Sequence, residues 1–207
     1  MALEFGPKLI TAAIAEFGEN TQEHALALNE HALSVHAAGR FSEAEGLYRQ
    51  ALDIDRATIG ETHPNYATDL NNLAGVVQAQ GRYDEAEGLY RQALDIGRAT
   101  IGETHPNYAT HLNNLAAVVK AQGRYDEAEG LYRQALDIDR ATIGETHPDY
   151  ATRLNNLAAV VQSQGKFAAA EPFYQQAIVI LDATLGPDHP TTVTIKANYA
   201  AMQAKQG

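Results

Sequence analysis

The chain has 207 residues, a formal net charge of −11 and no cysteine. The acidic balance argues against a nucleic-acid partner and against an anionic membrane surface, because both select basic patches. The missing cysteines exclude disulfides and thiolate metal sites, while a hydrophobic fraction of 45% is enough for a sizeable buried core.

No stretch of the sequence approaches the roughly 18 consecutive apolar residues of a membrane-spanning helix. The first residues, MALEFGPKL, lack the basic region and apolar run of a secretory signal. We therefore expect a cytoplasmic protein with neither a membrane nor a nucleic acid as its partner.

An internal repeat with a period of 42 residues dominates the sequence. Residues 61–102 and 103–144 are identical except at four pairs of positions, Asp69/His111, Gly75/Ala117, Gln78/Lys120 and Gly97/Asp139. The motif returns from residue 145, drifts after Gly165, and is present in weaker form before residue 61. A fixed period in this range indicates a stacked array, in which each unit contacts only its neighbours.

The repeat divides the chain into one continuous array. We expect a half repeat with a capping helix at 1–18, four repeats at 19–60, 61–102, 103–144 and 145–186, and a C-terminal capping helix at 187–207. In the half repeat, residues 7–17 take the place of a second helix. In the repeat that follows, the first helix, near 20–38, has drifted, and His31 stands where Leu73 stands one repeat later.

Each full repeat is predicted to contain two helices, near 64–80 and 84–101 in the repeat 61–102. Apolar residues recur at helical spacing in both. Pro64 suits a first helical turn and Gly81 a helix end. Asp84, with Glu87 three residues on, resembles a capping box, as does Ser42 with Glu45 in the preceding repeat.

The last helix pair departs from the pattern. The second helix of the fourth repeat is expected over 167–185, with Pro172 in its first turn. A solitary helix is expected over 190–206, where Lys196 replaces Leu154 of the apolar face, as a solvent-exposed cap would allow. The complete array then has about ten helices.

The pattern LNNLAxVxxxQGRYDEAExLYRQAL followed by THP resembles the tetratricopeptide repeat (TPR). The spacing of 42 resembles the kinesin-light-chain class rather than the common 34-residue form. The small and large signature positions match Leu73, Ala74, Ala86, Tyr90 and Ala93. The resemblance implies an all-α, right-handed superhelical α-solenoid of antiparallel helix pairs. It also implies that the first helices line a concave groove that binds peptide segments of partner proteins.

On a helical wheel, one polar face of each first helix coincides with the ligand-facing positions of the family. We predict that this face contacts a peptide through Asn29, Asn71, Asn113 and Asn155, Thr68, Thr110 and Thr152, Gln78, Lys120, Gln162 and His36, with Asn72, Asn114 and Asn156 at its edge. A side-chain amide both donates and accepts, so it can bind a peptide main chain of any sequence. The alternative is that these amides bridge neighbouring helices.

The predicted groove is polar and nearly neutral. Lys120 is its one full cation and His36 a partial one, whereas grooves of this class that take acidic peptides are expected to carry several basic residues. The Arg40, Arg82, Arg124 and Lys166 series is expected at a solvated rim. Leu26 and Leu33 allow two interpretations, an apolar pocket in the groove or packing against residues 7–17.

The sequence offers no candidate metal or catalytic site. Four histidines, His63, His105, His147 and His189, each precede a proline and recur once per repeat. Copies about 10 Å apart cannot share an ion whose ligands lie about 2 Å away, so we assign them to turns and packing. No catalytic or nucleotide-binding motif is present, and we expect neither enzymatic activity nor a cofactor.

The sequence therefore favours an interaction module that binds a protein or peptide in the concave groove. The alternative is a consensus-like structural array, natural or engineered, without a ligand of its own. The near-identity of two repeats favours that alternative, because groove positions that read different side chains normally diverge. Self-association through the ends of the array belongs to the same alternative.

Overall fold

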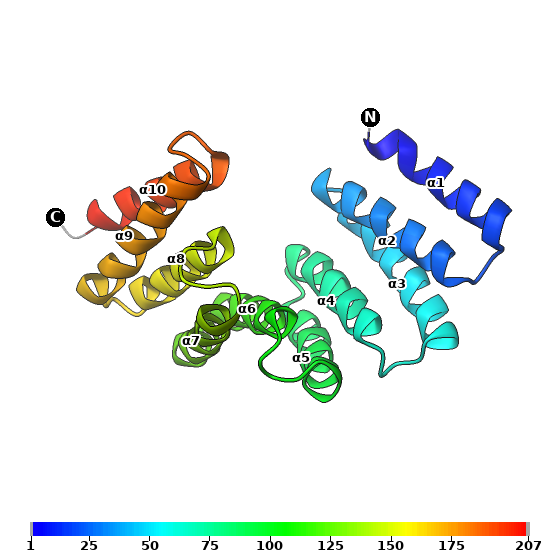
Figure 1. The fold of residues 1–207 in the computed structure, drawn as a ribbon, viewed down its shortest axis with the longest axis horizontal. Coiled ribbons are helices and arrows are strands. Elements are labelled where there is room, and N and C mark those ends of the chain that lie inside the picture. The colour runs from blue at the N-terminus through cyan, green and yellow to red at the C-terminus, as the bar shows by residue number, and fades with distance from the viewer. Residues whose placement is uncertain (1, 206–207) are drawn as a thin grey trace. The chain divides into compact units, whose positions relative to one another are not determined.

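A computed structural model describes residues 2–205, which form ten helices and no strand (Figure 1). The chain divides into two compact units, residues 1–102 and 103–207. The first unit holds α1 (Ala2–Phe17), α2 (Gln22–Ala37), α3 (Phe41–Thr58), α4 (Pro64–Ala79) and α5 (Tyr83–Thr100). The second holds α6 (Pro106–Ala121), α7 (Tyr125–Thr142), α8 (Pro148–Ser163), α9 (Phe167–Thr184) and α10 (Pro190–Gln203). The predicted all-α repeat array is confirmed.

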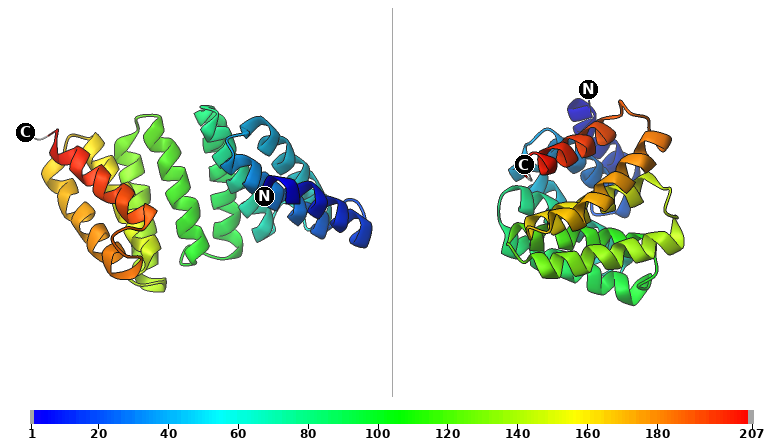
Figure 2. Two further views of the ribbon diagram at one scale, coloured as in Figure 1. Left: turned by 90° about the horizontal axis from the view of Figure 1, so that it is seen from above. Right: turned by 90° about the vertical axis from the view of Figure 1, so that its left-hand side faces the viewer.

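Within each unit, every helix packs against the next one along the chain (Figure 2). The second helix of each repeat carries a small and a large buried residue at the same two places. In α3 these are Ala44 and Tyr48, and in α7 they are Ala128 and Tyr132, all at most 2% exposed. The alanine lets the paired helices approach closely and the tyrosine ring fills the space beside it, so that each repeat packs its core in the same way.

The recurring histidines begin the first helices. In α4, His63 is the N-cap, Pro64 is at the start of the helix, and His63 Nδ1 accepts a 3.1 Å hydrogen bond from the Asn65 N–H. His105, His147 and His189 make the same bond to the second residue after them. Each histidine therefore satisfies a backbone N–H that the helix itself leaves unpaired.

Glycine ends the first helices, as predicted. In α4 the C-cap is Gln80, and Gly81 follows it with a φ of +79°. The Gly81 N–H donates to the Gln78 carbonyl, and the Arg82 N–H donates to the Val77 carbonyl. This pair of bonds is a Schellman motif, which requires a left-handed residue that only glycine adopts without strain.

The predicted capping boxes are wrong. Helix α5 begins at Tyr83 after the N-cap Arg82, whose side chain makes no capping bond, so Asp84 lies inside the first turn rather than before it. Ser42 is displaced in the same way, because α3 begins at Phe41. Asp84 then acts on the helix as a negative charge near its positive end and not as a cap.

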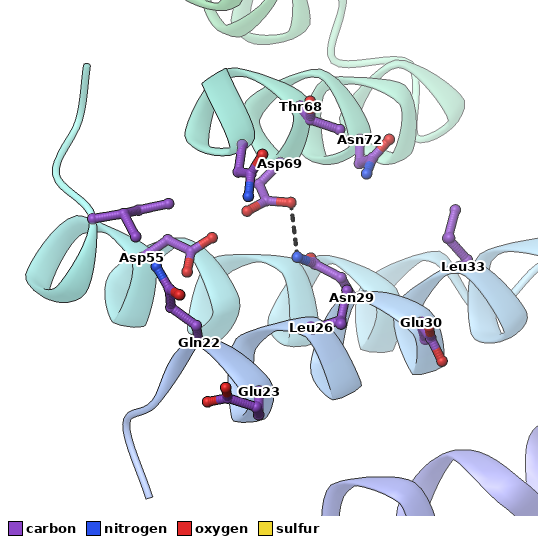
Figure 3. A pocket seen from close by; sticks show the side chains of 12 residues that line it. Gln22, Glu23, Leu26, Asn29, Glu30, Leu33, Asp55, Thr68, Asp69 and Asn72 are labelled. Carbon is purple, nitrogen blue, oxygen red and sulfur yellow. Dashed lines mark hydrogen bonds between the residues drawn. The ribbon is translucent and has the colours of Figure 1, made fainter. Parts of the chain in front are cut away.

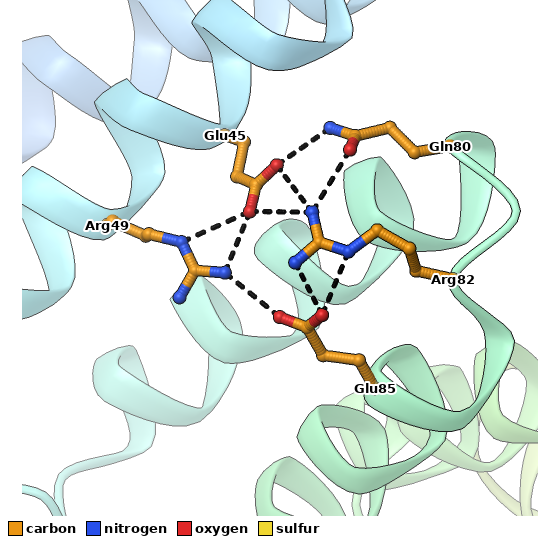
Figure 4. Close-up of polar contacts among 5 residues, drawn as sticks. All are labelled: Glu45, Arg49, Gln80, Arg82 and Glu85. Atoms are coloured by element: carbon orange, nitrogen blue, oxygen red, sulfur yellow. Dashed lines mark hydrogen bonds and ion pairs between the residues drawn. The ribbon is translucent and has the colours of Figure 1, made fainter.

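The Arg82 side chain is 39% exposed, and it also joins two repeats (Figure 4). Its Nη1 donates to Glu45 Oε2 of α3 at 2.8 Å, and Gln80 Nε2 donates to the same oxygen at 2.8 Å. Arg49 Nη2 donates to Glu45 Oε1 at 2.7 Å and to Glu85 Oε1 at 2.9 Å. Burial acts to raise the pKa of Glu45, but these hydrogen bonds outweigh it and lower the pKa to about 2.

Replacing the capping histidine should destabilise the array. His63→Ala removes the acceptor for the Asn65 N–H and should cost about 1 kcal/mol of unfolding free energy. His63→Asp supplies a carboxylate acceptor at the same place and should restore most of the loss. Urea unfolding of the three proteins measures both effects. Equal stability of the alanine and aspartate variants would contradict the capping role.

The Glu45 network should raise the free energy of unfolding near neutral pH, and this contribution should be lost in acid. The folded pKa of Glu45 is about 2 and the unfolded value is about 4.3. The contribution is therefore fully present above the unfolded pKa and is lost as the pH falls through the folded one. Glu45→Gln lacks it, so the wild-type advantage in unfolding free energy should shrink between about pH 5 and about pH 2. A constant difference across urea titrations in that range would rule the network out as a stabilising charge cluster.

Candidate functional site

A cavity of about 600 Å³ opens between α2, α3 and α4 of the first unit (Figure 3). Several predicted groove positions line it, from α2 Leu26, Asn29 and Leu33, and from α4 Thr68 and Asn72. Four acidic side chains also line the cavity, Glu23, Glu30, Asp55 and Asp69. The structure thus brings part of the predicted peptide-binding face together around one hollow.

Leu26 and Leu33 form an apolar wall of this cavity. They are 60% and 52% exposed, so neither is packed away against α1. Leu26 also borders a second hollow of about 250 Å³, which Leu9 and Phe17 of α1 line from the other side. Of the two interpretations from the sequence, the structure supports the apolar pocket.

Sequence reasoning missed the two acids at the bottom of the cavity. Asp55 is the last buried residue of α3, and Asp69 lies on α4. Each residue is 5% exposed. Figure 3 shows their carboxylates directed toward one another. Asn29 Nδ2 donates to Asp69 Oδ1 at 2.7 Å, whereas Asp69 Oδ2 and Asn29 Oδ1 are buried without a hydrogen-bond partner among the described residues.

This arrangement favours a protonated Asp69. Burial raises the pKa of Asp69 well above its usual value, and the neighbouring carboxylate of Asp55 raises it further. The hydrogen bond from Asn29 acts in the opposite direction but does not offset these two effects. The cavity therefore contains a carboxyl group that gives up its proton only when something compensates the charge.

The asparagines of the second unit form a ladder between neighbouring first helices. Asn156 Nδ2 of α8 donates to Asn113 Oδ1 of α6 at 3.0 Å, and Asn198 Nδ2 of α10 donates to Asn155 Oδ1 of α8 at 3.0 Å. Within a helix, the first asparagine donates to the second in the pairs Asn113–Asn114 and Asn155–Asn156. All these residues are half-buried. The alternative of amides that bridge helices is therefore realised here, with part of each amide still exposed.

The remaining predicted site residues have individual environments. Gln78 and Gln162 accept hydrogen bonds from Tyr90 and Tyr174, at 3.2 and 2.9 Å. Lys120 is half-buried, and burial lowers its pKa. The hydroxyls of Thr68, Thr110 and Thr152 donate to backbone carbonyls of their own helices.

Two further predicted residues lie outside the cavity wall. Asn71 is half-buried on α4, and His36 packs edge-on against Phe41 with 5.6 Å between ring centroids.

A buried ion pair occupies the place in the second unit that corresponds to the two acids. Asp139 of α7 and Arg153 of α8 stand two repeat periods after Asp55 and Asp69. Arg153 Nε donates to Asp139 Oδ2, and Arg153 Nη2 donates to Thr110 Oγ1 of α6 at 3.4 Å. Asp139 is fully buried and Arg153 is 8% exposed. The same inter-repeat position thus holds an acid pair in one unit and a salt bridge in the other.

Comparison with known proteins identifies the family. A model of the tetratricopeptide repeat matches residues 23–99, 70–141, 109–182 and 149–207. The chain belongs to the tetratricopeptide repeat family. TPR arrays generally mediate protein–protein interactions, and the fold is a non-catalytic scaffold.

Solved structures place this TPR array in the kinesin-light-chain-like class. BtubC (BKLC) from P. vanneervenii is 22% identical with a TM-score of 0.81, and the match covers 100% of this chain and 83% of that one. A kinesin-light-chain-type protein from Podosopora anserina with nearly identical TPR-like repeats is 27% identical with a TM-score of 0.75, covering 90% and 89%. A second crystal structure of that protein is 26% identical with a TM-score of 0.73, covering 87% of this chain and 85% of that one. No curated protein matches the sequence.

Other kinds of site find no support among the described residues of the TPR array. Residues 2–205 contain no cluster of three or more His, Cys, Asp or Glu side chains that could hold a metal ion. None of the helices in that range combines the length and apolar character needed to cross a membrane. The cavity of the first unit and the asparagine ladder of the second remain the features to explain.

The raised pKa of Asp69 should make the array less stable as the pH rises toward about 8. Between the unfolded pKa of about 3.9 and the raised folded value, the folded chain holds the proton that the unfolded chain has lost. Stability therefore falls as the pH rises through this window. Asp69→Asn removes this effect, so its advantage in unfolding free energy over wild type should grow between about pH 4 and about pH 8 and stay constant above that. Urea midpoints across the range measure it.

The matched control is the exposed Asp53→Asn in α3, which should follow the wild-type pH dependence. The groups that face Asp69 are Asp55 and Tyr48 of α3 and Asn29 of α2, and all are retained in both variants. If the curves of wild type and Asp69→Asn run parallel, Asp69 does not carry the proton.

Proposed function

We propose that this protein is an interaction module that binds an extended peptide segment of a partner along the polar face of its first helices. The observation that carries the proposal is the row of half-buried amides on this face. In the second unit, Asn113 Oδ1 and Asn155 Oδ1 each accept one bond from the next first helix, while a carboxamide offers two donors and two acceptor lone pairs. The face therefore keeps capacity for the main chain of a ligand.

The surroundings of the amides favour a peptide over a compact ligand. Ala117 and Ala159 are small and half-buried beside the ladder, which leaves room for a main chain to approach. The exposed residues that end α6 and α8, Ala121 and Ser163, add no obstruction. A disordered segment loses entropy when it is ordered on such a face, so affinities near micromolar are expected.

Two exposed alanines of the second unit provide a matched test. Ala121 is the last residue of α6 and follows Lys120 of the predicted peptide-binding face, and Ala141 lies on the second helix α7. A peptide is first selected from a displayed random library against the wild-type protein. Ala121→Trp should then lower its affinity by about ten-fold or more by obstructing the face, while Ala141→Trp should leave it unchanged. Fluorescence anisotropy measures binding, and thermal unfolding confirms that both variants stay folded.

The result that overturns the proposal is equal binding by both tryptophan variants. Failure of the library to yield any peptide that competes for this face counts against it as well.

A structural role is the second candidate, and the terminal helices favour it. Large apolar side chains are exposed on α1 and on the last two helices and their connecting turn, Phe5, Leu9, Phe17, Val179, Leu185 and Val193. Such surfaces suit stacking of one array on another. Light scattering over a range of concentrations separates the candidates. A mass that rises with concentration supports stacking, and a constant monomer mass supports a peptide-binding module.

A further inference from the structure

We propose that the cavity between α2, α3 and α4 is a binding site for a basic side chain, an Arg or Lys of the partner, whose charged group lies between Asp55 and Asp69. The inference rests on the proposed peptide-binding function and adds the chemistry of one ligand residue. It assigns one cation-binding position to a face that otherwise binds only the main chain of the peptide.

The charges that line the cavity all have one sign. Asp55 and Asp69 lie at its base and Glu23 and Glu30 on its α2 wall. Among the described residues, no basic side chain forms an ion pair with Asp55 or Asp69. A carboxylate buried without a counter-charge is costly, so a cation that enters the cavity gains more here than at a solvated surface.

The base of the cavity holds unused acceptors. Asp69 is 5% exposed and its Oδ2 has no hydrogen-bond partner, and the Oδ1 of Asn29 beside it has none either among the residues described. When Asp69 gives up its proton to a bound cation, its Oδ2 becomes an acceptor beside Asn29 Oδ1, and these acceptors match a guanidinium or an ammonium, which only donate hydrogen bonds. No third ligand completes a metal site in the part of the chain that the structure describes, so an organic cation fits the arrangement better than a metal ion.

The second unit shows which group fits this position. At the corresponding interface, Asp139 is paired with the guanidinium of Arg153, which extends to Thr110 on the preceding first helix. In the first unit the acid of the second helix is retained as Asp55, but the arginine is replaced by Asp69. The first unit therefore has the acidic half of a salt bridge, a second acid, and an open cavity in place of the basic half.

The walls above the acids suit the stem of a basic side chain. Leu26, Leu33 and Ile59 supply apolar surface around the opening, and the methylene stem of Arg or Lys buries well along such surface while its head reaches the charge. A guanidinium can also bond to both carboxylates at once because its donors form a planar fork. Arg is accordingly expected to bind more tightly than Lys.

Charged and neutral isosteres test the site directly. N-acetylarginine amide and N-acetylcitrulline amide have nearly the same shape, but only the first is a cation. Two-dimensional amide NMR of the wild-type chain should show shifts around Asn29, Asp55 and Asp69 with the arginine probe and at least about ten-fold weaker binding of the citrulline probe. Agmatine, a free cation without a peptide backbone, distinguishes a site for any small cation from one for a peptide residue.

Two substitutions separate charge from shape. Asp69→Asn keeps the size of the side chain and an acceptor for Asn29, and should weaken the arginine probe by about ten-fold or more. Asp69→Arg places a guanidinium beside Asp55 as Arg153 does beside Asp139, and should abolish binding by filling the site. The exposed Asp53→Asn is the matched control and should bind as the wild type does.

The outcomes decide between the site and its alternatives. Equal binding of the arginine and citrulline probes, or an unchanged affinity in Asp69→Asn, overturns the proposal. Binding of calcium at the same resonances, with displacement of the arginine probe, also overturns it in favour of a metal site. Agmatine binding as tight as that of the arginine probe, with no preference for Arg-containing peptides, overturns the peptide assignment.

Failure of this site can be told apart from failure of the proposed function. If the selected peptides are blocked by Ala121→Trp while the arginine probe binds wild type and Asp69→Asn equally, the peptide-binding face stands and the cation site does not. If the arginine probe depends on Asp69 while no peptide is affected by Ala121→Trp, the cation site stands without the extended groove.

Discussion

A carboxylate buried between two helices must meet a counter-charge or keep a proton, and this constraint acts at each inter-repeat position that carries an acid here. Asp139 meets the guanidinium of Arg153, and both side chains are buried. Asp55 meets Asp69, a second acid, and the interface opens into a cavity with unused acceptors. Removing charges from water is costly in both cases, but only the first case provides the compensation from within the chain. The same backbone arrangement therefore gives a structural contact in one unit and a candidate site in the other.

Local signals in the sequence were sufficient for the fold. Pro64 and Gly81 bracket a helix predicted near 64–80 and found at Pro64–Ala79, because proline suits the first turn and glycine the left-handed position after the last. The apolar spacing predicted the buried face. The capping box failed because Asp84 is the second helical residue, two positions after the N-cap Arg82, where it is a first-turn charge and not a cap.

The site was only partly predictable. The polar face of the first helices was found from its period, and Leu26, Asn29, Leu33, Thr68 and Asn72 do line one cavity. Asp55 and Asp69 were missed because they lie on faces that the period assigns to packing between helices. A signal was present, since Asp69/His111 and Gly97/Asp139 are two of the four places where otherwise identical repeats differ. In a nearly uniform array, a position that changes its charge is as informative as one that repeats.

The hydrogen-bond partners of the asparagines also could not be predicted from the sequence. A carboxamide can bridge two helices and still bind a ligand, because each bond uses only part of its capacity. The sequence placed the amides on one face but left their partners open, and the contacts of Asn113 with Asn156 and of Asn155 with Asn198 give them a structural role. Under the proposed function, the amides would bind a peptide main chain of any sequence. The acidic cavity would select a basic side chain at one position of the peptide.

A charge swap between the two interfaces tests the central claim most directly. The double variant Asp69→Arg with Arg153→Asp exchanges the acid and the base, so that the first interface gains the salt bridge and the second gains the acid pair. Amide NMR with N-acetylarginine amide then locates the site. The account predicts that the shifted resonances move from Asn29 on α2 to Thr110 and Asn113 on α6. Shifts that remain around α2, or that are spread evenly over both units, would contradict it.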